Sequence, residues 1–295
     1  MWLTRVTQGL VWLLSLLPYS WIRRLAIPLG LIAWYCAGGR RRITLINLRL
    51  CFPEWSEQQR ILVAKAHFIT FMASILSIGM QWYASRQRLQ DSVRLVDLHH
   101  WDAVRDQPVI LLAPHFLGLD VIGIRLSAEF PLMALFGRHK NPRINDLIFN
   151  QRTRFSGGFL YTRQHALRQV IKDLKAPRAF YYLPDLDFGS KESVFLPFFG
   201  IPTATTPALS RLAKLTGAKV VPCIPRERAD KEGYEACFYP AWENFPSEDP
   251  IADSQRMNDF IEARIREIPE QYLWSHKRFK TRPPGEPSFY GKDSQ

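Results

Sequence analysis

Cysteine is scarce and unpatterned in this sequence. The four cysteines, Cys36, Cys51, Cys223 and Cys237, form no CxxC pair and share no regular spacing. This excludes the usual zinc and dithiol patterns, and we expect reduced, mostly buried thiols in a cytoplasmic compartment. The sequence also lacks a zinc-finger Cys/His spacing and an aromatic–basic strand signature, so we expect no nucleic-acid partner.

Acidic residues are also in deficit. The 295 residues hold 27 Asp and Glu against 39 Lys and Arg, for a net charge of +12. Such a balance indicates an anionic partner. Aromatic residues make up 13% of the chain, with nine tryptophans, and favour a membrane surface. A hydrophobic fraction of 47% is enough for one sizeable α/β core with an appended segment.

The N-terminus has apolar stretches but no small-residue cleavage site of a signal peptide. Two such stretches, 9–22 and 25–37, flank Arg23 and Arg24, and neither reaches the roughly 20 apolar residues of a bilayer span. The basic cluster 38–42 favours a cytoplasmic location. We predict a membrane anchor over residues 1–42. It is one tilted span, or two interfacial helices broken at Pro18 and Pro28; the alternative is a buried helical hairpin.

The remaining chain divides by its pattern. Residues 43–88 have leucines at helical spacing and a capping box at Ser56 and Gln59, and we expect helices that pack on the core. From residue 89 to 283, short apolar runs alternate with helical stretches. This alternation predicts an α/β fold with a mostly parallel central sheet flanked by helices. Residues 284–295 are polar and proline-rich, and predict a flexible tail.

The strand VILLA is followed by PHFLGLD, which places His115 at the carboxyl end of a buried strand. Active sites of parallel sheets form at such ends. Asp120, five residues later, is expected to accept a hydrogen bond from one ring nitrogen, leaving the other to act as a base. The sequence has neither a GxSxG elbow nor a cysteine in a reactive context. The substrate is therefore expected to bring its own hydroxyl, as in acyl transfer from a thioester.

The stretch HFLGLD matches the H-x4-D/E motif of glycerolipid-type acyltransferases, and other stretches resemble the lipid A biosynthesis acyltransferases, the lauroyl/myristoyl group of Gram-negative bacteria. Their joint order along the chain is far more specific than the short motif. From residue 46 to residue 283 they are INLRLCFPEWS, GMQWY, KNPRIND with QRTR, LPDLDFG, SVFLPFFGIPTATTPALSRLAKLTGAKVVP and QYLWSHKRFKTRP.

This resemblance implies a single-pass or monotopic enzyme at the cytoplasmic face of the inner membrane. It implies acyl transfer from acyl carrier protein to a hydroxyl of a lipid A precursor, without cofactor or metal. His115 and Asp120 then form the catalytic dyad, and Arg152 and Asp185 match positions associated with activity. Many close relatives have glutamate where this chain has Asp120. Two alternatives stay open: another lipid or glycolipid acceptor, such as a lysophospholipid or an ornithine lipid, and a non-catalytic membrane adaptor.

Four basic residues are candidate substrate contacts, because guanidinium and ammonium groups bind the phosphates of lipid A precursors. Arg152 and Arg154 follow the helix that begins at KNPRIND, and Arg138 and Lys140 lie just past a strand end. The alternative for the two helix-end arginines is a solvated basic surface.

Three other motifs have competing interpretations. PDLDFG contains the DFG of protein kinases and the D-x-D of metal-dependent glycosyltransferases, but the chain has no glycine-rich kinase loop or HRD motif. We expect Asp185 to orient an arginine or the acceptor. VFLPFFG is predicted as a core strand and turn, or as one wall of an acyl groove. YLWSHKRFKTRP is predicted to lie at lipid head groups or as a solvated tail.

Overall fold

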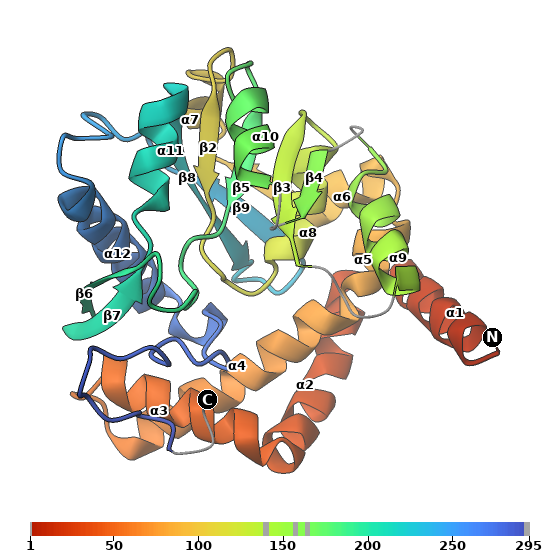
Figure 1. The fold of residues 1–295 in the computed structure, drawn as a ribbon. Helices are drawn as coiled ribbons and strands as arrows, with labels where there is room; N and C mark the ends of the chain where they lie inside the picture. The colour runs from red at the N-terminus through yellow and green to blue at the C-terminus, as the bar shows by residue number, and fades with distance from the viewer. Residues whose placement is uncertain (1, 138–141, 156–158, 163–165, 292–295) are drawn as a thin grey trace.

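The computed structural model describes residues 2–137, 142–155, 159–162 and 166–291 as an α/β sheet above a layer of N-terminal helices (Figure 1). The helices are α1 (Trp2–Leu16), α2 (Tyr19–Cys36), α3 (Gly38–Cys51), α4 (Glu57–Leu76), α5 (Ile78–Tyr83), α6 (Arg86–Ser92), α7 (His99–Asp102), α8 (Leu119–Ser127), α9 (Pro142–Arg152), α10 (Ala166–Asp173), α11 (Ala208–Thr216) and α12 (Pro250–Glu267), followed by a 3₁₀ turn η1 (Pro269–Gln271). The strands are β1 (Val93–Val96), β2 (Val109–Leu112), β3 (Leu132–Phe136), β4 (Phe159–Thr162), β5 (Ala179–Tyr182), β6 (Val194–Phe198), β7 (Ile201–Thr205), β8 (Lys219–Glu227) and β9 (Tyr234–Phe238).

The central sheet has the order β1-β9-β8-β2-β5-β3-β4. Strands β8, β2, β5, β3 and β4 are parallel, and β9 joins β8 in antiparallel pairing with β1 parallel to β9. The predicted mostly parallel α/β fold is confirmed. β4 had no counterpart among the predicted strands, and β6 with β7 forms a separate antiparallel hairpin.

Successive side chains of β2 point to opposite faces of the sheet, and both faces are covered by helices. Ile110 and Leu112 belong to one apolar core, which includes side chains of α3, α4, α11 and α12. Val109 and Leu111 belong to the other core, with side chains of α2 and α8. All four are buried, as expected for a central parallel strand between two helical layers.

The N-terminal helices pack against the α/β domain and also expose an apolar face. α2 begins after Pro18, as predicted, but continues through Pro28, so the predicted break at Pro28 is wrong. Gly30 permits a close crossing of α2 and α4, since a Cβ atom there would lie 2.5 Å from the Cα of Ile69. From residue 8 onward, the exposed large apolar residues of α1 and α2 are Leu10, Trp12, Leu13, Leu16, Trp21, Leu25, Ile27, Leu29, Ile32 and Tyr35.

The predicted capping box begins α4: Ser56 accepts from the backbone N–H of Gln59, whose side chain accepts from the backbone N–H of Ser56. Within the described part of the chain, the helical stretch Glu57–Tyr83 is long and apolar enough to cross a membrane by length and composition. It lies outside the predicted anchor, and α4 directs His67 into the protein interior.

His67 makes the fold sensitive to acid. Burial lowers the pKa of its imidazole to about 4, although the carbonyl groups of Glu270 and Tyr272 oppose this shift. In the unfolded chain the ring takes up a proton near its ordinary pKa of 6.5, so stability is lost as pH falls from 6.5 toward 4 and is regained above 6.5.

We therefore expect His67→Gln to reduce the acid sensitivity of folding. Between pH 7 and pH 5 the wild type should lose about 2 kcal/mol of unfolding free energy through this group, and the variant should not. Urea denaturation midpoints at the two pH values measure the difference. An equal loss in both proteins contradicts the assignment.

The C-terminal segment differs from its prediction. Trp274, Arg278 and Phe279 are buried, so YLWSHKRFKTRP is not a merely solvated tail. Its placement at lipid head groups stays a prediction. In the part of the predicted flexible tail that the structure describes, residues 284–288 are exposed, whereas Tyr290 is buried and its hydroxyl donates to Asn47 at 2.5 Å. Aromatic side chains within the basic run explain the burial, because they contribute apolar area that the helical layer covers.

Candidate active site

The loop after β2 is held between β5 and the segment that follows α12. The N–H of Ala113 donates to the carbonyl of Tyr182, which extends the β2–β5 pairing to the start of the loop. Phe116 then forms an antiparallel bridge with Tyr272, and the N–H of Leu273 donates to the carbonyl of His115 at 3.0 Å. Backbone hydrogen bonds therefore help to fix His115 at the carboxyl edge of the sheet.

The Asp185 carboxylate forms two hydrogen bonds with His115. One carboxylate oxygen lies 2.7 Å from the ring Nδ1, and the other accepts the backbone N–H of His115 at 2.9 Å. The Asp185 side chain is 1% exposed and the His115 side chain 15%, so the carboxylate is enclosed while the ring reaches the surface. β2 and β5 are parallel neighbours, so the loops that follow them meet at one edge.

The electrostatics of this pair determine the tautomer. Burial is the largest influence on Asp185 and raises its pKa. The charge of His115, two hydrogen bonds from His115 and the charge of Arg278 together outweigh burial, so the pKa is lowered. An ionised carboxylate can only accept, so Nδ1 carries the proton. When the ring is neutral, Nε2 therefore has the lone pair and can accept a proton.

The prediction that Asp120 binds the His115 ring is wrong in its geometry. Asp120 lies in the first turn of α8, and its carboxylate accepts from Nη2 of Arg152 at 2.5 Å. The cause is the packing of α8 beside α9, which ends at Arg152. Arg152 and Asp120 are 34% and 43% exposed, so this ion pair is accessible to solvent.

Arg154, predicted as a substrate contact, is engaged elsewhere. Its guanidinium donates to the carbonyl of Ala84 at 2.6 Å and to that of Met80 at 3.5 Å, at the C-terminal end of α5. It also lies over the Phe155 ring at 4.2 Å. Burial lowers its pKa to about 10. These contacts cap a helix end. The other two predicted contacts, Arg138 and Lys140, lie outside the described residues.

The two aspartates of PDLDFG serve different partners. Asp187 accepts from the backbone N–H of Thr281 at 2.6 Å, from its hydroxyl at 2.7 Å and from the N–H of Gly189. Asp185 accepts from His115, a contact that the sequence did not suggest. Its predicted role in orienting an arginine or the acceptor stays a prediction. Across the described ranges, no group of three or more His, Cys, Asp or Glu side chains could hold a metal ion.

His276 and Arg278 are residues near the site for which the sequence suggested no catalytic contact. Arg278 donates to the carbonyl of Ala204 at 3.0 Å and lies close enough to Asp185 to lower its pKa. Burial, followed by the charges of His115 and Arg278, lowers the pKa of His276, which favours a neutral ring. Only the pairing of Tyr272 with the His115 loop brings these residues here, and no local pattern encodes it.

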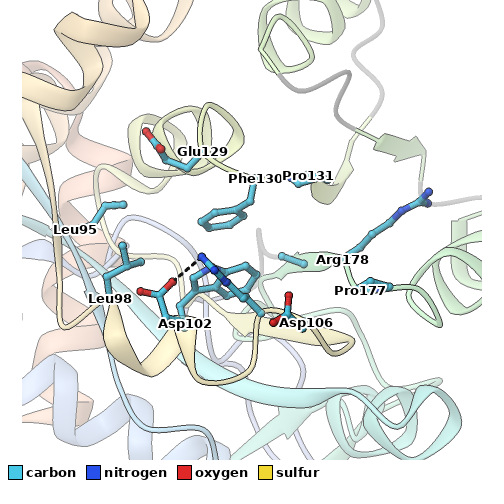
Figure 2. A pocket seen from close by; sticks show the side chains of 12 residues that line it. Leu95, Leu98, Asp102, Asp106, Glu129, Phe130, Pro131, Pro177 and Arg178 are labelled. Carbon is cyan, nitrogen blue, oxygen red and sulfur yellow. Dashed lines mark hydrogen bonds and ion pairs between the residues drawn. The ribbon is translucent and has the colours of Figure 1, made fainter.

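A pocket of about 270 Å³ lies at the opposite end of the parallel strands from His115, and Figure 2 shows the side chains that line it. Leu95, Leu98 and Phe130 line it together with Asp102 and Asp106. Most of its lining residues precede β2, β3 or β5, whereas His115 and Asp185 follow β2 and β5. The pocket is therefore separate from the histidine–aspartate pair, which lies where parallel sheets carry their chemistry.

Comparison with known proteins decides the family. The bacterial lipid A biosynthesis acyltransferase family matches residues 1–281. The chain is 35% identical over 292 residues to the lipid A biosynthesis lauroyltransferase of Escherichia coli K12, covering 98% of this chain and 95% of that protein. The chain belongs to this family.

Two further relatives are consistent with that membership. A lipid A biosynthesis acyltransferase of Haemophilus influenzae is 34% identical over 93% of this chain and 86% of its own length. The lipid A biosynthesis palmitoleoyltransferase of Escherichia coli K12 is 32% identical over 98% and 94%. The acyltransferase described here therefore spans nearly the full length of these relatives, and the resemblance noted in its sequence is confirmed.

Proposed function

We propose that this acyltransferase moves a fatty acyl chain from acyl carrier protein to a hydroxyl of a lipid A precursor at the cytoplasmic face of the bacterial inner membrane. The observation that carries the proposal is the buried Asp185 carboxylate, which holds the Nδ1–H of a surface-reaching His115. Family membership supports acyl transfer to lipid A.

The reaction follows from the tautomer. Nε2 of His115 removes the proton from the acceptor hydroxyl as its oxygen attacks the thioester carbonyl. The ionised Asp185 stabilises the imidazolium that forms. When the tetrahedral intermediate collapses, the C–S bond breaks, and the leaving thiolate takes the proton from Nε2. The products are an ester and the free thiol of the carrier, and the enzyme returns to its starting protonation state.

Arg152 is the proposed contact for an anionic group of the acceptor. A guanidinium has five N–H donors and binds phosphate bidentately. The Asp120 carboxylate occupies one end and holds the group in place. In this proposal Asp120 acts on the catalytic site through Arg152, as an orienting residue, while Asp185 supports the base.

The exposed apolar face of α1 and α2 is the proposed membrane seat. It combines leucines and isoleucines with Trp12 and Trp21, and tryptophan favours the interface between lipid and water. Arg24 lies over the Trp21 ring at 5.6 Å, which keeps a cation beside this face. The chain's charge of +12 suits both anionic head groups and an acidic carrier protein.

An assay of every combination of two acyl donors and two acyl acceptors tests the proposal. Purified enzyme is given myristoyl or lauroyl thioesters of acyl carrier protein or of coenzyme A, with either a lipid A precursor or a lysophospholipid as acceptor. We expect product by mass spectrometry from the carrier thioester and the lipid A precursor, at a rate at least tenfold above other pairs. Preference for the lysophospholipid, or no transfer with any pair, contradicts the assignment.

A further inference from the structure

A buried carboxylate lies where α2 meets the sheet. Glu227 ends β8 and its side chain is fully buried. It accepts the hydroxyl of Tyr19 at 2.6 Å and forms ion pairs with Arg23 at 2.9 Å and Lys231 at 2.8 Å. Burial raises the pKa of Tyr19 well above its ordinary range, as do Tyr234 and Glu227. The hydroxyl therefore stays protonated and donates a hydrogen bond to Glu227. α2 is thereby bound to the sheet through two residues of its first two turns.

One route leads from this cluster to the catalytic loop through aromatic rings. The Tyr19 ring packs edge-on against Tyr234, with centroids 4.8 Å apart. The Tyr234 hydroxyl lies 3.1 Å from the Ser77 hydroxyl, which fixes the ring at its far end. Gly118 lies directly against this ring: a Cβ atom there would lie 2.6 Å from the tyrosine Cε1, and its φ of +93° also favours glycine. The turn between His115 and α8 therefore packs directly on the Tyr234 ring.

A second route reaches the same loop through the backbone. The N–H of Glu227 donates to the side-chain carbonyl of Gln271 at 2.7 Å. The backbone carbonyl of Gln271 accepts the N–H of Leu117, also at 2.7 Å. The two routes thus end at adjacent residues, Leu117 and Gly118, two and three positions after His115. A shift of Glu227 acts on both.

The outer side of α2 is free to contact lipid. Its buried residues Tyr19, Ile22 and Ala26 face the protein, whereas Trp21 and Leu25 are exposed. α2 therefore has one apolar side toward the protein and another toward its surroundings, with Tyr19 on the inner side. A movement of α2 therefore moves Tyr19 and Arg23, and through them the Glu227 carboxylate where both chains of contacts begin.

We propose that Tyr19, Glu227 and Tyr234 are positioning residues that transmit the membrane seating of α2 to the loop carrying His115, so that a lipid surface raises the rate of acyl transfer. The inference rests on the proposed function, because it assumes that His115 is the base. Misplacing a catalytic group by about 1 Å can lower a rate by about 10²-fold, so small movements of residues 117 and 118 suffice.

The test compares Tyr19 with a tyrosine outside the proposed membrane seat. Tyr19→Phe removes the donor to Glu227 and keeps the ring on Tyr234, while Tyr83→Phe removes a hydroxyl from the partly exposed last residue of α5. Turnover is measured with and without vesicles of phosphatidylethanolamine and phosphatidylglycerol, and vesicle binding by flotation. We expect vesicles to raise kcat of the wild type and of Tyr83→Phe about tenfold. Tyr19→Phe should bind vesicles equally, with an unchanged KM for the donor, and show no rise.

Tyr234→Phe is the second variant, since it loses only neutral hydroxyl contacts, with Ser77 and Tyr19, and is expected to fold. A reduced vesicle response in this variant, at an unchanged Tm, supports the proposal. Wild-type vesicle response in both Tyr19→Phe and Tyr234→Phe overturns it, as does a loss that follows the fraction of unfolded protein. Parallel assay of His115→Asn separates the two levels: wild-type turnover there refutes the proposed function, whereas an inactive His115→Asn with normal tyrosine variants refutes this inference alone.

Discussion

His115→Asn is expected to lower kcat of acyl transfer by about 10³-fold, within the range for loss of a general base. The asparagine amide places an N–H donor near the position of Nδ1, so the buried Asp185 keeps a partner and the fold is preserved. Nothing then replaces Nε2. Steady-state turnover with the carrier thioester measures the effect, and circular dichroism verifies folding.

The matched control for that variant is His99→Ala. His99 is an exposed histidine in α7, at the opposite end of the parallel strands from His115. Its removal should leave turnover within twofold of the wild type. A folded His115→Asn enzyme with wild-type turnover contradicts the assignment of the base.

Asp185→Asn is expected to lower kcat by about 10²- to 10³-fold, because a neutral amide no longer selects the Nδ1–H tautomer or stabilises the imidazolium. The substitution preserves shape, so KM for the donor should change little. The double variant His115→Asn/Asp185→Asn should be no slower than the single histidine variant, since both residues act in one proton transfer.

Asp187→Asn provides the control within the same loop. It removes a carboxylate charge two residues away, whose hydrogen bonds go to Thr281 and Gly189 rather than to His115. We expect a reduction of less than tenfold. A loss of kcat as large as that of Asp185→Asn would show that the conformation of the loop, and not the contact with His115, accounts for the effect of Asp185→Asn.

Local signals in the sequence predicted local structure well. The capping box of Ser56 and Gln59, the buried strand β2 and the position of His115 at its end were all readable from short windows. The helix–strand alternation predicted a mostly parallel sheet because each signal spans one element. β4 was missed, since four residues in a glycine-flanked stretch hold too little pattern to be distinguished from a loop.

The partner of His115 was not readable in the same way. Asp120 was the nearest carboxylate along the chain, whereas Asp185 becomes the nearest in space only because β5 pairs beside β2. Pairing between strands about 70 residues apart is determined by the packing of the whole domain, and the sequence of neither loop contains a pattern that predicts it. The burial of Arg278 near Asp185 likewise depends on Tyr272 joining the His115 loop.

Nitrogen-15 NMR of the histidine-labelled enzyme tests most directly which carboxylate holds the base. The structure predicts that the His115 ring carries its proton on Nδ1 in a strong hydrogen bond. That signal should be lost in Asp185→Asn and unchanged in Asp120→Asn. A signal that survives in Asp185→Asn and disappears in Asp120→Asn would contradict the account.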